Sequence, residues 1–294
     1  MLGVELAFAA ALAALLAAGL SLPLGAALVV SLALLLLVPG LLVAVSFVIA
    51  ALLAPVVPTG LVHKARALLT EAVELHLAAL TMALPRSLLR TVDLDEAAPD
   101  ERSDRPLLLI HGIVCNHNIW RPWLKRLRAA GFGPVRAVNL EPLFADIEVH
   151  AARVARELRA LQRNANGARV SIIAHSMGGL VARAALRLLG PGTIHRIVTI
   201  ASPHHGTRLA RCALPPLRQM SPDSPWLRSL NTAQEGHFAA PVTSIYSLED
   251  NLVVPPRSAR LAGAPAHELR GFGHLGVLSS RRAIEQTLAA LADA

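Results

Sequence analysis

The chain has 294 residues, which is enough for one large domain or two ordinary ones. Its hydrophobic fraction of 54% and mean hydropathy of +0.50 exceed those of a typical soluble chain, so part of it is expected to lie in lipid. A net charge of +8 without an aromatic-rich basic motif argues against a nucleic-acid-binding protein, and two cysteines without metal-ligand spacing argue against a zinc site or a disulfide framework.

The charged residues divide the chain near residue 60. All 28 Lys and Arg residues, and all of the 20 acidic residues except Glu5, follow that point. Attraction of this basic part to anionic lipid is one interpretation of the charge. The alternative is coding bias, because only Lys64 and Lys125 are lysines.

Residues 1–60 are predicted to form a transmembrane helical anchor, because a membrane span needs about 20 apolar residues and this run has length for two. A hairpin with a first span at 2–20 and a turn at 21–25 is the favoured arrangement, and one long tilted span is the alternative. A cleaved signal peptide is disfavoured, because no Lys or Arg precedes the apolar run. The predicted location is a membrane, taken as the bacterial inner membrane.

Residues 61–105 are expected to connect this anchor to a second domain. Residues 61–84 have helical apolar spacing with Lys64, Arg66, Glu71 and Glu74 elsewhere on the helix, which predicts an amphipathic helix on the membrane or on the domain. The positive charges beside the apolar run favour a cytoplasmic domain. Residues 93–105 are polar and are predicted to be a linker.

Residues 106–294 alternate short apolar runs with helical stretches, which predicts an α/β fold with a mainly parallel sheet. The expected strands are 106–111, 134–140, 168–174, 194–200, 241–247 and 266–270. The expected helices are 119–130, 147–165, 177–189 and 280–292. Ligands of such sheets lie beyond the carboxyl ends of the strands, so the chemistry is expected in the loops that follow them.

The segment Ala-His-Ser-Met-Gly-Gly at 174–179 stands between a predicted strand and a predicted helix. This pattern is typical of a nucleophile elbow, in which small residues allow a tight turn that exposes a serine hydroxyl. Ser176 is therefore the predicted nucleophile. The alternative, a serine that only caps the helix, explains the strand and the turn less well.

A nucleophilic serine needs a histidine base and a carboxylate that orients it, both expected downstream in this fold. His274 follows the last predicted strand and is the predicted base. Asp250 follows the preceding strand and is the predicted acid, with Glu249 as its close competitor. The oxyanion donors are expected to be the main-chain amides of Met177 and Ile113.

These segments together resemble the bacterial triacylglycerol lipase and esterase group of the α/β-hydrolases. The resemblance covers residues 106 to about 292 and is carried by AHSMGG, HGIVCNHNIW at 111–120, SPHHGT at 202–207, SLEDNLVVPP and GHLGVLSS. It implies an α/β-hydrolase fold, ester hydrolysis, Ser176, Asp250 and His274 as the triad, and Ile113 and Met177 as the oxyanion hole.

The substrate is expected to contact His111, Gly112 and Trp226. Trp226 lies in residues 208–240, which are predicted to form a cap whose apolar side chains line an acyl pocket or pack into a small core of their own. His204 and His205 are adjacent and lack a third ligand at suitable spacing, so no metal is expected.

The predicted function is membrane-anchored hydrolysis of carboxylic esters, with lipids or acylglycerols as substrates, no cofactor and no nucleic-acid partner. Two alternatives remain open. The same triad could serve an acyltransferase or thioesterase, or the chain could be a membrane-tethered binding protein with a retired site.

Overall fold

The structure is a computed structural model that describes residues 2–54, 58–83, 105–234 and 237–292. The predicted linker at 93–105 therefore lies outside the described residues, apart from Arg105. Three helices precede the sheet. They are α1 (Leu2–Leu20), α2 (Leu24–Leu53) and α3 (Leu61–Ala83).

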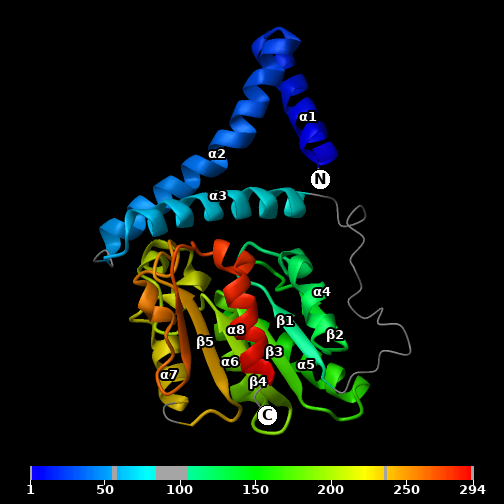
Figure 1. Cartoon of the computed structure of the whole chain (residues 1–294), viewed down its shortest axis with the longest axis vertical. Helices are drawn as coiled ribbons and strands as arrows, with labels where there is room; N and C mark the ends of the chain where they lie inside the picture. Colours follow the sequence, from blue (N-terminus) through cyan, green and yellow to red (C-terminus); the bar gives the residue numbers. More distant parts are fainter. Residues whose placement is uncertain (1, 55–57, 84–104, 235–236, 293–294) are drawn as a thin grey trace.

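Helices α1 and α2 pack against each other above the rest of the chain (Figure 1). Among the described residues, α2 is the one helix long and apolar enough to cross a membrane, and α1 contributes the shorter apolar stretch Ala10–Leu20. The described part of the apolar N-terminal run is helical, and α2 is its candidate membrane span.

The predicted parallel α/β sheet is confirmed, with all six strands in place. They are β1 (Leu107–Ile110), β2 (Val135–Val138), β3 (Val170–His175), β4 (Ile194–Ile200), β5 (Val242–Ser247) and β6 (Ala266–Leu269). All pairs are parallel, and the order across the sheet is β2-β1-β3-β4-β5-β6. The order reverses between β1 and β3, and such a reversal opens a crevice at the carboxyl ends of the two strands.

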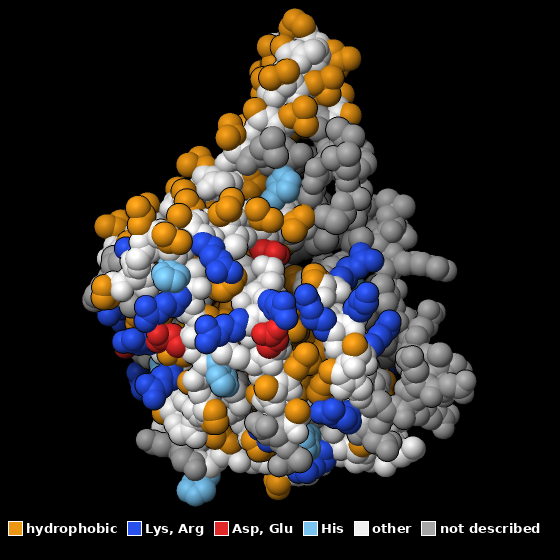
Figure 2. Space-filling model, viewed as in Figure 1, with side chains coloured by type: hydrophobic (Ala, Val, Ile, Leu, Met, Phe, Trp, Pro, Cys, Tyr) orange, Lys and Arg blue, Asp and Glu red, His pale blue; other side chains and the backbone are white. Residues whose placement is uncertain are grey.

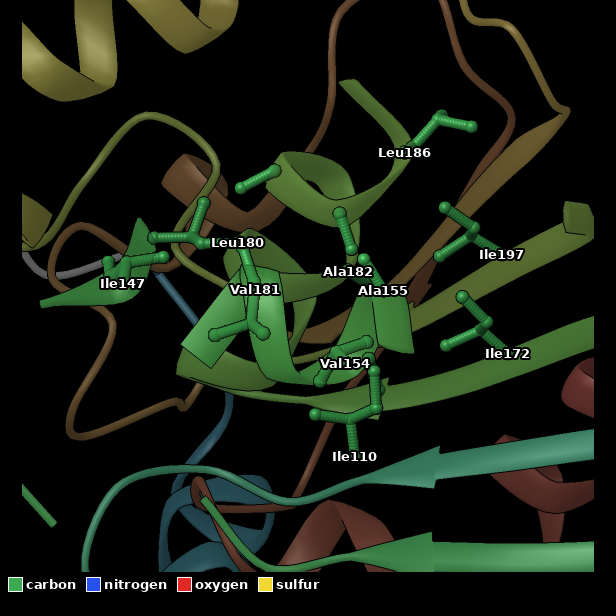
Figure 3. Close-up of a cluster of buried hydrophobic side chains, with 14 of the residues drawn as sticks. Ile110, Ile147, Val154, Ala155, Ile172, Leu180, Val181, Ala182, Leu186 and Ile197 are labelled. Atoms are coloured by element: carbon green, nitrogen blue, oxygen red, sulfur yellow. The ribbon is translucent and has the colours of Figure 1, made fainter. Parts of the chain in front are cut away.

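Helices cover both faces of the sheet because alternate strand residues point to opposite faces. Leu108 and Ile110 pack with α5 (Ile147–Asn164) and α6 (Met177–Leu189) in the cluster drawn in Figure 3. Leu107 and Leu109 pack on the other face, against α4 (Arg121–Ala129) and α8 (Arg281–Ala292). The result is a three-layer domain.

The described part of the segment 208–240, which was predicted to be a cap, consists of short helices joined by loops. It contains the short 3₁₀ helices η2 (Arg208–Cys212) and η3 (Pro215–Met220) and the helix α7 (Pro225–Ala233). Buried residues of α7, Leu227 and Leu230, join the core cluster formed by α5 and α6. Its apolar side chains thus extend the domain core instead of forming a separate one.

The helix that lies across the domain is α3 (Figure 1). It contacts the 3₁₀ helices η1 (His117–Trp120) and η5 (Gly276–Ser279), which follow β1 and β6 respectively. Since both follow the carboxyl ends of strands, α3 covers the edge of the sheet at which the crevice opens. A further 3₁₀ helix, η4 (Pro256–Ala259), lies between β5 and β6.

Candidate active site

Ser176 lies at the reversal of strand order, directly after β3, and faces the loop that follows β1. A Cβ atom placed on Gly112 would lie 2.7 Å from the Ser176 Cβ and 3.2 Å from its Oγ. Only a glycine lets the backbone approach the serine this closely. The two loops at the topological switch point therefore meet at the Ser176 hydroxyl.

The turn at Ser176 has the geometry of a nucleophile elbow. The residue has φ of 55° and ψ of −129°, a combination that side-chain-bearing residues rarely adopt. The amide of Ser176 donates to the carbonyl of Ile200 at 2.9 Å, which holds the strained turn against β4. This backbone conformation turns the side chain away from the ladder of β3 and toward the crevice.

Gly178 makes the tight strand-to-helix turn possible. A Cβ atom on this residue would lie 2.6 Å from the carbonyl oxygen of His111 and 2.7 Å from that of Ile110. Both atoms belong to the backbone and cannot rotate away. Helix α6 therefore begins close enough to β1 to hold Ser176 at the crevice only because residue 178 lacks a side chain.

Replacement of Gly178 by alanine is expected to destabilise the protein by about 1–3 kcal/mol, the usual cost of overpacking a core. Thermal unfolding of the detergent-solubilised protein, followed by circular dichroism, measures the change. Gly25→Ala is the matched control, because nothing lies within 4 Å of the added Cβ atom. An unchanged midpoint for Gly178→Ala would contradict the tight packing of the elbow.

The structure brings the predicted base and acid into contact. The Nδ1 atom of His274 lies 3.0 Å from Oδ2 and 3.1 Å from Oδ1 of Asp250. The Oδ1 atom also accepts the amides of Leu252 and Val253, both at 2.8 Å, which fixes the orientation of the carboxylate. Because Nδ1 donates to Asp250, the Nε2 atom of His274 is left as the ring's acceptor.

Glu249, the competing acid, points elsewhere. Its Oε2 atom accepts the hydroxyl of Ser247 at 3.2 Å and the amide of Gly271 at 2.7 Å. These bonds tie the loop after β5 to the loop after β6. Of the two carboxylates, only Asp250 is hydrogen-bonded to His274.

His274 is buried among groups that set its charge. Burial alone would lower its pKa, but the charge of Asp250, the hydrogen bond to it and the charge of Glu71 outweigh burial and raise the pKa above its ordinary value. The neighbouring His175 donates from Nε2 to the carbonyl of His274 at 3.0 Å, and the two rings lie 4.8 Å apart. His274 thus lies beside the strand residue that immediately precedes Ser176.

Within the described residues, no hydrogen bond joins the Ser176 hydroxyl to His274. Such bonds often tighten only when substrate is bound. The main-chain amides of Ile113 and Met177 also donate to no other group in the described part of the chain. Met177 is the first residue of α6, where an amide has no intrahelical acceptor and carries the positive end of the helix dipole.

Comparison with known proteins agrees with this geometry. Residues 101–215 match the protein family described as "Putative serine esterase (DUF676)". A triacylglycerol lipase of Pseudomonas fragi is 28% identical over 114 residues, which cover 36% of this chain and 36% of that protein. The chain therefore spans about a third of the length of this curated relative.

Solved structures share the fold. Lipase BlEst2 of Bacillus licheniformis in its mature form gives a TM-score of 0.56 at 16% identity, covering 64% of this chain and 92% of the other. Lipase B of Aspergillus fumigatus gives 0.54 at 20% identity, covering 64% of this chain and 52% of the other. Phospholipase PlaB of Legionella pneumophila gives 0.53 at 15% identity over 64% of this chain and 59% of the other. The chain therefore shares the parallel-sheet α/β-hydrolase fold of these solved structures.

Two residues predicted to bind substrate have other partners in the α/β-hydrolase domain. His111 donates from Nδ1 to the carbonyl of Gly112 at 2.7 Å and accepts the amide of Leu140 at Nε2, 3.0 Å away. Burial lowers its pKa to about 4, so the ring is neutral and both nitrogens are occupied. Trp226 donates its indole N–H to Glu148 on α5 at 2.7 Å. The side-chain nitrogens of His111 and Trp226 are thus bonded within the protein, and Gly112 lies beside Ser176.

Of the histidine pair 204–205, His204 belongs to a buried polar network. His204 donates from Nε2 to the Thr199 hydroxyl at 2.9 Å and accepts Arg183 at Nδ1, 3.3 Å away. Arg183 also donates to Gln234 and Asn231, which attaches α7 to α6. Both ring nitrogens of His204 therefore serve the packing of the domain.

The sequence did not indicate two side chains that hold the loop of His274. Asn251 accepts the amide of His274 at 2.9 Å, and Glu71 of α3 accepts the amides of Leu275 and Gly276 at 2.8 Å each. Asn251 directly follows Asp250, and this position next to the predicted acid was the only feature of the sequence that could have pointed to it. Glu71 lies more than 200 residues away in sequence, and only its polar character within an apolar helix marked it.

Proposed function

We propose that the chain is a membrane-anchored serine hydrolase that cleaves the carboxylic esters of lipids through an acyl-serine intermediate. The observation that carries the proposal is the contact of His274 Nδ1 with Asp250 beside an elbow that presents Ser176. This contact leaves Nε2 unprotonated and able to accept the serine proton. Ser176, Asp250 and His274 are the proposed catalytic residues.

The reaction proceeds in two halves. His274 takes the proton of Ser176 as Oγ attacks the ester carbonyl, and the amides of Ile113 and Met177 bind the resulting oxyanion. Breakage of the C–O bond releases the alcohol, which takes its proton from His274. Water then loses a proton to His274, attacks the acyl-serine and releases the carboxylic acid, and the proton returns to Ser176.

The distribution of polar and apolar side chains on α3 supports a lipid substrate. A helix on the surface of a soluble domain usually buries its apolar side chains and exposes its charged ones, and α3 does the opposite at several positions. Its buried positions include Glu71, whereas Leu61 is 83% and Val62 is 78% exposed. In water, such an outward apolar face would be unfavourable, and a bilayer removes this cost. We therefore place α3 on the membrane surface with the crevice facing lipid.

Helix α2 supports the same orientation. Its 30 residues extend about 45 Å at 1.5 Å per residue, enough to span a hydrocarbon core. Figure 2 shows apolar side chains along the projecting helices and Lys and Arg side chains gathered on the domain below them. Such a basic surface next to an apolar anchor attracts anionic lipid headgroups. We propose a bacterial inner membrane with the domain on its cytoplasmic side.

An apolar cavity of about 480 Å³ supports a long-chain acyl substrate. It lies between α2, α3 and the segment after β5, and its walls include Phe47, Ala51, Leu68 and Val254, with Asp250 also among the lining residues. Its volume falls within the ordinary range of small-molecule sites, about 300–1,000 Å³. An acyl chain leaving the bilayer could occupy it beside the catalytic acid.

Labelling with a fluorophosphonate tests the assignment of the nucleophile. The detergent-solubilised protein is expected to incorporate one equivalent at Ser176, located by peptide mass spectrometry. Hydrolysis of p-nitrophenyl esters from short to long acyl chain then tests the substrate class. Rates that rise with chain length support a lipid substrate, whereas a protein that is neither labelled nor active contradicts the proposed function.

Substitution of Ala51 by phenylalanine is expected to reduce the hydrolysis of long-chain esters relative to short-chain esters by roughly tenfold, the scale on which a few methylenes discriminate in an apolar pocket. The ratio of kcat/KM for the two esters measures the effect. Leu52→Phe is the control, because Leu52 is 80% exposed and lies outside the cavity lining. Equal ratios in both variants would place the acyl chain elsewhere.

A further inference from the structure

The loop that carries His274 is held by a buried carboxylate from the membrane-side helix α3. The Oε2 atom of Glu71 accepts the amides of Leu275 and Gly276 at 2.8 Å each, and Glu71 is 2% exposed. Within the described residues, it forms no salt bridge with Lys or Arg. A buried carboxylate costs free energy unless its charge is used or compensated. Its nearest compensation is therefore the pair of amides and the ring of His274.

The loop is shaped to receive this helix. A Cβ atom on Gly273 would lie 2.5 Å from Oε2 of Glu71, and one on Gly276 would lie 2.7 Å from the hydroxyl oxygen of Thr70. The glycines on both sides of His274 thus allow α3 to approach the backbone of the base. The contact between α3 and this loop is therefore closer than ordinary packing between surface side chains.

Glu71 and His274 also interact through charge. Burial raises the pKa of Glu71 to about 7, although His274 and the two amides oppose the rise and Asp250 adds to it. In turn, Glu71 raises the pKa of His274. The other titratable group that faces Glu71 is Cys115, whose pKa is raised to about 11 by burial and by Glu71. Among the described residues, the charged or titratable groups that act on His274 are Asp250, Glu71 and His175.

Helix α2 reaches the same loop through Asn251. The side-chain amide of Asn251 donates to the Ser46 hydroxyl of α2 at 2.8 Å, while its carbonyl accepts the amide of His274 at 2.9 Å. The backbone around the base is therefore attached to α2 through Asn251 and to α3 through Glu71. Helices outside the α/β domain thus help to hold the loop that carries His274.

We propose that Glu71 is a positioning residue for His274, which makes the membrane-side helix α3 a component of the active site. This inference rests on the proposed function of Ser176 and His274. Glu71 touches no reacting atom. It acts by fixing the backbone at Leu275 and Gly276 and by favouring the imidazolium that forms when Ser176 gives up its proton. A hydrolase domain from which α3 has moved away would lack this support.

The test compares Glu71→Gln with the wild type by the rate of fluorophosphonate labelling at Ser176 between pH 5 and 9. Glutamine can still accept both amides but carries no charge. The acid limb is expected to move to lower pH by about one unit, a usual effect of removing a nearby carboxylate. The plateau rate is expected to fall roughly tenfold, which corresponds to that same loss of imidazolium stabilisation. Glu71→Asp, which keeps the charge, should restore the position of the acid limb.

Glu74→Gln is the matched control, because Glu74 lies one turn further along α3 and the described amides of Leu275 and Gly276 donate to Glu71 and not to it. Its rate and pH profile should equal those of the wild type. A Glu71→Gln variant with the wild-type profile and plateau would overturn the proposal. A wild-type protein that is not labelled at Ser176 would instead overturn the proposed function, so the two failures are distinguishable.

If Glu71→Gln does not fold, a measurement on the wild type tests the same proposal. The amide resonance of ¹⁵N-labelled Gly276 should titrate with the same midpoint as the acid limb of labelling, because the amide bonds to the carboxylate that acts on His274. An amide shift that is flat across the acid limb would overturn the proposal.

Discussion

Replacement of Ser176 by alanine is expected to abolish ester hydrolysis, with a fall in kcat on the order of a millionfold, as observed when a triad serine is removed from other hydrolases. The loss follows from the chemistry, because alanine has no atom that can form the acyl intermediate. Burst kinetics with a p-nitrophenyl ester and fluorophosphonate labelling measure it, and both signals should vanish together.

The fold should survive this change. In the described residues the Ser176 side chain makes no hydrogen bond, and the backbone turn is held by its amide and by Gly178. Ser258→Ala is a matched control, since both serines are 8% exposed and Ser258 lies in η4. Its activity should equal that of the wild type. Activity that persists in Ser176→Ala would show that the nucleophile lies elsewhere.

Replacement of Asp250 by asparagine is expected to lower kcat by about 10⁴-fold, the effect of the equivalent change in a serine protease triad. Asparagine still offers an oxygen to the amides of Leu252 and Val253, so the loop keeps its shape. Its amide group, however, donates to His274 Nδ1 and forces the ring's proton onto Nε2. The ring then cannot accept the proton of Ser176.

Glu249→Gln is the control for this change because the two carboxylates are adjacent and both buried. Glutamine can still accept the hydroxyl of Ser247 and the amide of Gly271, and activity should remain near that of the wild type. If Glu249→Gln lost activity and Asp250→Asn kept it, the roles of the two acids would be exchanged.

The pH dependence of kcat/KM offers a further check on the same pair. His274 must be neutral to act as base, so activity falls as pH drops through its pKa, which lies above the ordinary value of 6.5. In Asp250→Asn the largest influence that raises this pKa is lost. The acid limb of the residual activity should therefore lie at lower pH than in the wild type.

Local patterns were sufficient to predict the sheet and the elbow. The central strands β1 and β3 were predicted because their residues are buried on both faces and form short apolar runs, as in Leu107–Ile110. Ser176 was predicted because a tight turn demands small residues at fixed spacing, a requirement visible within six residues. The apolar run of α2 was evident for the same reason, since its signal is continuous in sequence.

The remaining features depend on contacts between segments far apart in the chain. Nothing near positions 249 and 250 indicates which carboxylate reaches His274, because the loop's folded path decides it. Nothing in the sequence indicated that the ring nitrogens of His111 and Trp226 bond to Leu140 and Glu148. Glu71 contacts the histidine loop because α3 packs across the strand ends, and the sequence does not show this packing. Periodicity reports which face of an element is buried, whereas tertiary packing decides which partner buries it.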